Sequence, residues 1–169
     1  MKKISWVLGI LLLMQACEKT ESQSVTQDLV EIEFTKEGVL TFSNEEGVAL
    51  KTIDIEIADN ANKRARGLMD RSEMADNQGM LFIFGDDEVR KHTFYMKNTR
   101  IPLDILYFDR DSVLINIARN AKPGADSELA GGTVAAAKED SKFVVEVNGG
   151  LAEKWGIEEG VTKINWQRN

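Results

Sequence analysis

The chain has almost none of the residues that form covalent cross-links or soft-metal sites. Its 169 residues include one cysteine, Cys17, and one histidine, His92. A single cysteine cannot close an internal disulfide, and one histidine without a second cysteine excludes the common Cys/His zinc clusters. The sequence also has no CxxC pair, glycine-rich phosphate loop or Ser-His-Asp set. We therefore predict no cofactor and no metal site, although oxygen ligands could still hold a hard metal ion.

Basic residues are also fewer than acidic ones. Lysine and arginine number 21 against 28 aspartates and glutamates, which gives a net charge of −7. An acidic surface is repelled by phosphate backbones, so we expect no nucleic-acid partner. The apolar fraction of 43% is enough for the core of one domain.

The N-terminus has the pattern of an export signal. Lys2 and Lys3 precede an apolar run, Ile4 to Met14, which is too short to span a bilayer but fits the central region of a signal peptide. The run leads to Ala16-Cys17, which is similar to a bacterial lipobox, although Met14-Gln15 departs from the usual residues there. The alternative is an ordinary secretory signal with a chance cysteine.

From this pattern we predict a signal peptide over residues 1–16 and a lipidated Cys17 followed by a polar tether over 17–28. Several acyl chains together anchor a protein more firmly than one. The expected partner is therefore a lipid bilayer, reached through acylated Cys17. The expected location is the bacterial cell envelope, in either the inner or the outer membrane.

The rest of the chain predicts a mostly-β fold. Apolar residues alternate with polar ones in several short runs, and Gly79 to Phe84 is so apolar that it should be a central strand covered on both faces. The expected strands are 29–34, 39–42, 53–57, 79–84, 92–96, 103–108, 113–118, 142–147 and 161–166, with short helices over 60–66 and 151–155. No βαβ rhythm is present, so we expect a compact β-sandwich or barrel with two short helices.

The expected domain organisation follows from these elements. Residues 29–49 form an N-terminal β extension, and residues 50–169 form the main β domain. The helix over 60–66 should be capped by Asp59 or Asn60 and should end at Gly67 in a left-handed conformation. The polar loop over 119–137 is long for a compact domain, so it is a candidate lid or rim.

Four groups of residues carry a resemblance to a known family. They are Arg64-Ala65-Arg66-Gly67-Leu68-Met69 with Arg71; Gly79-Met80-Leu81-Phe82 with Phe84; Phe94-Tyr95-Met96-Lys97-Asn98-Thr99 with Ile101-Pro102-Leu103-Asp104-Ile105; and Val145-Glu146-Val147-Asn148 with Gly150 and Gly156. In this order and spacing they resemble the DUF192 family, also called UPF0127, over about Ile53 to Trp166. One departure is Tyr95, where the family often carries tryptophan. The resemblance implies a compact β fold of jelly-roll type, often exported or membrane-tethered, and implies no activity.

Polar residues beside a predicted turn form the first candidate site. Lys97, Asn98 and Asp104 flank the turn, and Arg71 comes from the loop after the first helix. A partly buried lysine with a carboxylate could anchor a ligand or transfer protons. The alternative is a structural cluster, in which Asn98 bonds the turn backbone and Asp104 pairs with Lys97 or Arg71.

Glu146 and Asn148 alternate with valines in the predicted strand 142–147 and the turn after it. They could bind a hydroxylated ligand, or they could simply be solvent-facing strand positions. Because Asn148 precedes Gly149-Gly150, we predict that it caps the second helix.

Methionines accompany the single histidine at several positions. Met69, Met80 and Met96 with His92 are compatible with Cu(I), since thioether and imidazole are suitable ligands. These methionines lie in apolar runs, however, where methionine fills gaps in cores. Core packing is the favoured interpretation.

Three hypotheses for function follow. The leading one is a non-enzymatic binding or accessory domain of the envelope that takes a small polar ligand or glycan near Lys97, Asn98 and Asp104. The second is a small enzyme that uses Asp104 and Lys97 as an acid–base pair on an envelope metabolite or glycan. The third is a purely structural or interaction protein.

Overall fold

The computed structural model describes residues 31–124 and 134–169. The predicted signal peptide, Cys17 and the tether lie outside the described residues, as do residues 125–133, which belong to the candidate lid. Within the described ranges, no helix has the length and apolar character needed to cross a bilayer.

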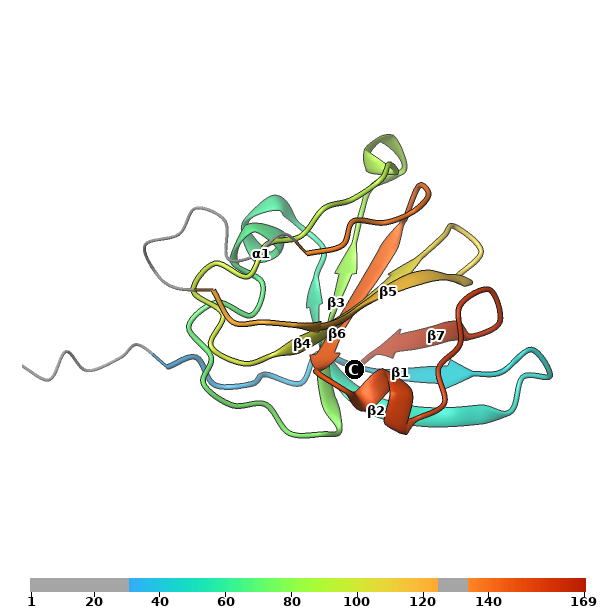
Figure 1. The fold of residues 1–169 in the computed structure, drawn as a ribbon, viewed down its shortest axis with the longest axis horizontal. Helices are drawn as coiled ribbons and strands as arrows, with labels where there is room; N and C mark the ends of the chain where they lie inside the picture. The colour runs from blue at the N-terminus through green and yellow to red at the C-terminus, as the bar shows by residue number, and fades with distance from the viewer. Residues whose placement is uncertain (1–30, 125–133) are drawn as a thin grey trace, which may run out of the picture.

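The described part of the chain is mostly β, as predicted (Figure 1). It contains strands β1 (Gly38–Ser43), β2 (Ala49–Ala58), β3 (Gln78–Ile83), β4 (Leu103–Phe108), β5 (Leu114–Ala121), β6 (Phe143–Asn148) and β7 (Lys163–Arg168). Two short α-helices, α1 (Ala61–Arg66) and α2 (Leu151–Lys154), and one 3₁₀ turn, η1 (Asp86–Glu88), complete it.

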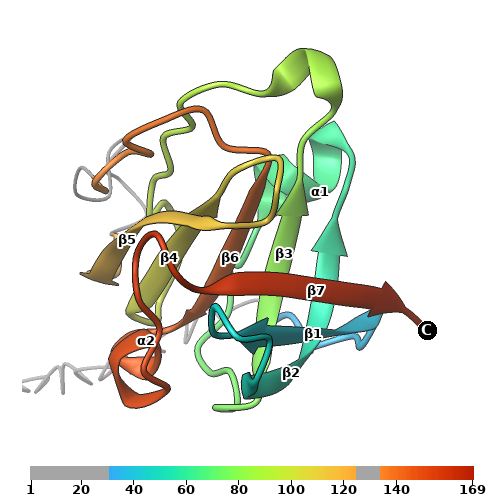
Figure 2. The same ribbon diagram turned by 90° about the vertical axis from the view of Figure 1, so that its right-hand side faces the viewer.

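The strands form one seven-stranded sheet in the order β5-β4-β6-β3-β2-β1-β7. All neighbouring pairs are antiparallel except β2 and β3, which are parallel and are joined through α1. The sheet curls, and an isolated bridge between Val113 and Lys163 joins the start of β5 to β7 (Figure 2). The sheet is not closed, and the fold is sandwich-like.

The predicted central strand is confirmed. β3 lies in the middle of the sheet, and its four inner residues, Gly79 to Phe82, are all buried. Gly79 permits close packing here, because a Cβ at this position would lie only 2.8 Å from the carbonyl oxygen of Glu146. The continuous apolar run therefore reflects burial on both faces.

Each face of the sheet has its own hydrophobic cluster. The first contains Ile55, Leu81, Val145 and Leu106, and also includes residues of β1, β7 and α2. The second lies on the opposite face and is covered by segments without strand structure. Its members are Ala58, Leu68, Met80, Phe82, Phe84, Met96, Ile101, Leu103, Ile105, Tyr107, Ala118, Val134, Ala137 and Val144. This second face carries the cavity described below.

Helix α1 begins and ends as its sequence predicts. The Asn60 side chain accepts a hydrogen bond from the Lys63 backbone N–H at 3.0 Å, which satisfies one free donor of the first turn. Gly67 follows the helix with a φ of 48°, a conformation that costs glycine little.

The prediction of a strand over residues 92–96 is wrong. These residues show the apolar–polar alternation of a strand but form no ladder. Both neighbours of β4 are already occupied, by β5 and β6, so this segment crosses the outer face of the sheet instead. The bonds of its backbone carbonyls go to loops: Ala137 donates to His92 and Gly124 donates to Met96.

The expected strand over 29–34 is also absent from its described part, residues 31–34. Ile32 and Phe34 are half-buried while Glu31 and Glu33 are exposed, so the alternation correctly predicts which side faces the domain. The hydrogen bonds in this region involve side chains, and no neighbouring strand of the described ranges pairs with the backbone. For example, the Thr35 N–H donates to Oε1 of Glu56 at 2.9 Å.

Candidate functional site

Asp104, the central residue of the predicted site, is fully buried at the end of the sheet near α2. Its Oδ1 accepts from the Asn120 N–H at 2.8 Å, and its Oδ2 accepts from the N–H groups of Gly150 and Ala152, each at 3.0 Å. Asp104 therefore joins β4, β5 and the start of α2. The prediction that Asn148 caps this helix is wrong, because Asp104 takes that role.

Arg71 lies elsewhere. Its guanidinium is buried and pairs with the buried Glu56 of β2 at 2.6 Å. The expected pairing of Asp104 with Lys97 or Arg71 is therefore wrong, because the Asp104 carboxylate is satisfied by backbone donors and Arg71 has its own carboxylate.

Lys97 and Asn98 form a turn whose backbone is held by a neighbouring loop. Asn98 has a φ of 52°, and its carbonyl accepts from the Asp70 N–H at 2.8 Å. Its side-chain Oδ1 is buried and has no partner among the described residues, so the expected side-chain bond to the turn is not made. None of the four predicted site residues pairs with another, and none lines the cavity beside α1 on this face.

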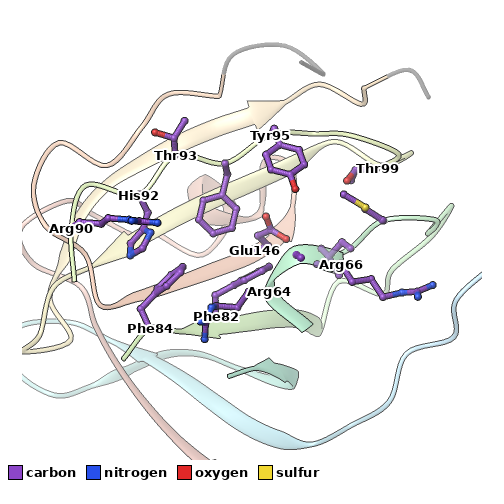
Figure 3. Close-up of a pocket in the computed structure, with 15 residues that line it drawn as sticks. Arg64, Arg66, Phe82, Phe84, Arg90, His92, Thr93, Tyr95, Thr99 and Glu146 are labelled. Carbon is purple, nitrogen blue, oxygen red and sulfur yellow. The ribbon is translucent and has the colours of Figure 1, made fainter. Parts of the chain in front are cut away.

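That cavity lies between α1, β3, β6 and the segment over 90–99 (Figure 3). Its volume is about 240 Å³. Fifteen residues line it: Arg64, Ala65, Arg66, Gly67, Leu68, Met69, Phe82, Phe84, Arg90, His92, Thr93, Phe94, Tyr95, Thr99 and Glu146.

Glu146 lies at the floor of the cavity, in the middle of β6 between Met80 of β3 and Ile105 of β4. It is only 4% exposed, and its Oε2 has no hydrogen-bond partner among the described residues. Burial raises the pKa of the Glu146 carboxyl to about 8, so the group is mostly protonated at pH 7. The interpretation of Glu146 as a solvent-facing position is wrong, because loops cover this face of β6.

A second unpartnered polar group lies on the same face. Tyr107 is fully buried, and its hydroxyl has no partner among the described residues. It pairs with Val144 across the β4–β6 ladder, two residues from the Ile105–Glu146 pair, so it belongs to the same row of side chains. Burial and the nearby Glu146 charge both raise the pKa of the Tyr107 hydroxyl.

Aromatic side chains form the walls. Phe82 and Phe94 meet edge to face with centroids 5.0 Å apart, and Phe84 stacks on His92 at 3.5 Å. Burial lowers the pKa of His92, and its Nε2 has no partner within the described ranges. Tyr95 stands at the mouth with 51% of its surface exposed.

Three arginines surround the cavity. Arg64 is held in place: its Nη2 donates to both carboxylate oxygens of Glu88, at 2.8 and 2.9 Å, and its guanidinium lies 5.2 Å from the centroid of the Phe84 ring. Arg66 and Arg90 are exposed and form no ion pair with any described residue. In Figure 3 they lie at opposite ends of the cavity.

The methionines divide between the core and this cavity. Met80 and Met96 are buried in the second hydrophobic cluster, where they fill space between strands and loops. Met69 lines the cavity but is not buried. Across the described ranges, no three side chains of His, Cys, Asp or Glu gather as a metal site.

The strings that carry the family resemblance meet at this cavity. All the lining residues except Arg90, His92 and Thr93 lie in those strings, although the strings are far apart in the sequence. The turn string contributes Phe94, Tyr95 and Thr99 to the lining, while its polar residues, Lys97 and Asn98, do not contribute. The turn string thus borders the cavity through side chains other than the polar ones predicted as a site.

These observations define a class of protein: a sandwich-like β domain with a buried carboxyl group under an aromatic cavity. The chain belongs to the DUF192 family, described as an uncharacterized ACR, whose model matches residues 41–165. No curated protein matches the sequence.

Two crystal structures are similar to this chain. One is a protein of unknown function from Novosphingobium aromaticivorans DSM 12444, with 34% identity and a TM-score of 0.66; the match covers 76% of this chain and 84% of that chain. The other, from Sinorhizobium meliloti 1021, is described as a candidate transcription regulator. It has 28% identity and a TM-score of 0.67, and the match covers 81% of this chain and 98% of that chain.

Proposed function

We propose that this protein is a binding domain of the bacterial envelope that holds one hydroxylated ring, such as the terminal sugar of a glycan, in the cavity above Glu146. The observation that carries the proposal is the buried, partnerless Glu146 carboxyl at the floor of an aromatic-walled cavity. Burying an unpaired polar group costs stability, so its retention at the floor of a cavity favours a role in ligand contact.

The size and walls of the cavity suit a single ring. Drug-sized ligands occupy cavities of about 300–1,000 Å³, so a cavity of about 240 Å³ fits a smaller molecule. Phe82 and Phe94 offer apolar surfaces against which the C–H face of a sugar could pack. Tyr95 adds an exposed aromatic surface at the mouth, where a second sugar ring could continue the chain.

The Glu146 carboxyl is suited to a hydrogen bond with a ligand hydroxyl. A protonated carboxyl donates one hydrogen bond and still accepts others, and a sugar hydroxyl does the same. A ligand hydroxyl in the cavity would therefore give the Glu146 carboxyl a partner that the described protein residues do not offer. Such a bond in a water-poor cavity contributes more than the same bond at the surface.

Sugar titrations of the folded domain test this proposal. We expect at least one of D-glucose, D-galactose, D-mannose, N-acetyl-D-glucosamine, D-glucuronate and D-galacturonate to shift the amide NMR signals of residues around Glu146. Glu146→Leu should weaken that binding at least about tenfold, because the ligand hydroxyl loses its buried partner. Glu153→Leu, an exposed change on α2, serves as the matched control and should bind normally. Signals that shift elsewhere, or binding that survives in Glu146→Leu, would contradict the proposal.

An acid–base enzyme is the second candidate. The cavity contains both Glu146, which is mostly protonated at pH 7, and His92, whose pKa is lowered so that it is neutral. A carboxylic acid and a free imidazole facing one ligand could donate and accept protons. Asp104 and Lys97 no longer support this hypothesis, because Asp104 is occupied by backbone donors. Conversion of a sugar during the titrations, lost in Glu146→Gln, would favour the enzyme over the binding domain.

The membrane anchor is the other part of the proposal. It is supported by the lipobox-like Ala16-Cys17 and the polar stretch after it. When the full-length protein is expressed in a bacterium, we expect it to partition into the detergent phase of a phase-separation assay. Cys17→Ala should move it to the aqueous phase, while a Ser24→Ala control in the tether should not. Equal partitioning of wild type and Cys17→Ala would reject lipid anchoring.

A further inference from the structure

The charges around the cavity differ from those of the chain as a whole. The protein carries a net charge of −7, yet three arginines and no exposed carboxylate line this cavity. Glu88 neutralises Arg64, which leaves Arg66 and Arg90 without an ion pair among the described residues. A locally positive mouth on an acidic protein raises the local concentration of anions and favours their entry.

The floor of the cavity is compatible with an anion. Glu146 is the one acidic residue that lines the cavity within the described ranges, and its carboxyl is mostly protonated at pH 7. It can therefore donate a hydrogen bond to the ring without repelling a negative group nearby. A cationic ligand would have to pass the arginines to reach this neutral carboxyl.

From these contacts we infer that the ring held over Glu146 carries a carboxylate, as in a uronic acid, and that the carboxylate binds an arginine at the mouth. This inference rests on the proposed sugar-binding function and adds the ligand's charge to it. Arginine suits the role, because its planar guanidinium binds a carboxylate through two parallel hydrogen bonds. Arg66 and Arg90 lie at opposite ends of the cavity, so one carboxylate reaches one of them.

Matched pairs of sugars test the inference by calorimetry at pH 7 and low salt. D-glucuronate should bind at least about tenfold more tightly than D-glucose, and D-galacturonate more tightly than D-galactose, as one charge-assisted pair predicts. The double variant Arg66→Gln/Arg90→Gln should remove this preference, so that each uronic acid binds no more tightly than its neutral partner sugar. Lys163→Gln, an exposed change on β7, is the control for overall charge and should keep the preference.

The outcomes separate this inference from the function on which it rests. If neutral and acidic sugars bind equally and Glu146→Leu abolishes both, the charge inference is wrong and sugar binding stands. Tighter binding of D-glucosamine than of D-glucuronate would likewise overturn the charge inference alone. If no sugar binds, both proposals are wrong.

Discussion

Replacing Asp104 by alanine should lower the free energy of unfolding by about 3–5 kcal/mol. Three backbone N–H groups, of Asn120, Gly150 and Ala152, donate to its carboxylate in a site from which water is excluded. Alanine leaves all three donors without a partner and removes the side-chain bonds from β4 to Asn120 of β5 and to the start of α2, while the β4–β5 ladder remains. Urea unfolding of the protein, followed by tryptophan fluorescence, measures the loss.

Two further variants make this result specific. Asp104→Asn keeps one acceptor oxygen, so its stability should lie between those of wild type and Asp104→Ala. Asp140→Ala removes an exposed carboxylate and should change stability by less than about 0.5 kcal/mol. A loss below about 1 kcal/mol for Asp104→Ala would mean that the three bonds contribute little.

The pH dependence of stability should reveal the buried Glu146. Its pKa is about 8 in the folded protein and near 4.5 in the unfolded chain, so the folded state binds more protons between these values. Stability due to this group is therefore complete below pH 4.5 and is lost as the pH rises to about 8, by about 1.4 kcal/mol per pH unit at most. Glu146→Gln cannot ionise, so it should match wild type below about pH 4 and exceed it by about 3–5 kcal/mol at pH 9.

The comparison with a variant isolates Glu146 from other titrating groups. Exposed carboxylates with lowered pKa values, such as Glu31, Asp76 and Asp86, lose stabilising contacts only when the pH falls through the acid range. Burial lowers the pKa of His92, and this contribution is the same in both proteins. Glu153→Gln should give a curve parallel to wild type. If the Glu146→Gln curve is also parallel, Glu146 ionises normally and is not buried as described.

Local patterns predicted much of the fold. The alternation around Ile55 and the apolar run at Gly79 to Phe84 predicted two strands, the second of them central, and both are strands of the sheet. Asn60 and Gly67 predicted the two ends of α1. These signals act over a few residues, which is why sequence alone was sufficient.

The sequence could not predict which alternating segments find a strand partner. Residues 92–96 and 31–34 alternate like strands but join no ladder, and both neighbours of β4 are already β5 and β6. A segment can join a sheet only beside a strand that has an unpaired edge. Which strand edges are unpaired depends on the topology of the whole domain. The same limit explains the error at Asn148: the acceptor at the start of α2 is Asp104, which is distant in sequence.

The candidate site was predicted in part. The family strings contribute most of the cavity lining, whereas Asp104, predicted as a ligand-binding candidate, has backbone N–H groups as its partners. Glu146 was weighed only as an exposed strand position or a ligand contact. A carboxylate flanked by Val145 and Val147 looks solvent-facing until the loop over 90–99 is known to cover that face.

The most direct test follows the Glu146 carboxyl carbon by NMR as a function of pH, with and without saturating D-glucuronate. In the free protein the signal should titrate with a pKa near 8, and glucuronate should raise that value, because a bound anion disfavours a second negative charge. Through linkage, glucuronate affinity should fall as the pH rises through this range. Of the other titratable groups that line or underlie the cavity, His92 is already neutral there and Tyr107 stays protonated. A pKa near 4.5 that no sugar changes would contradict both the buried acid and its role in binding.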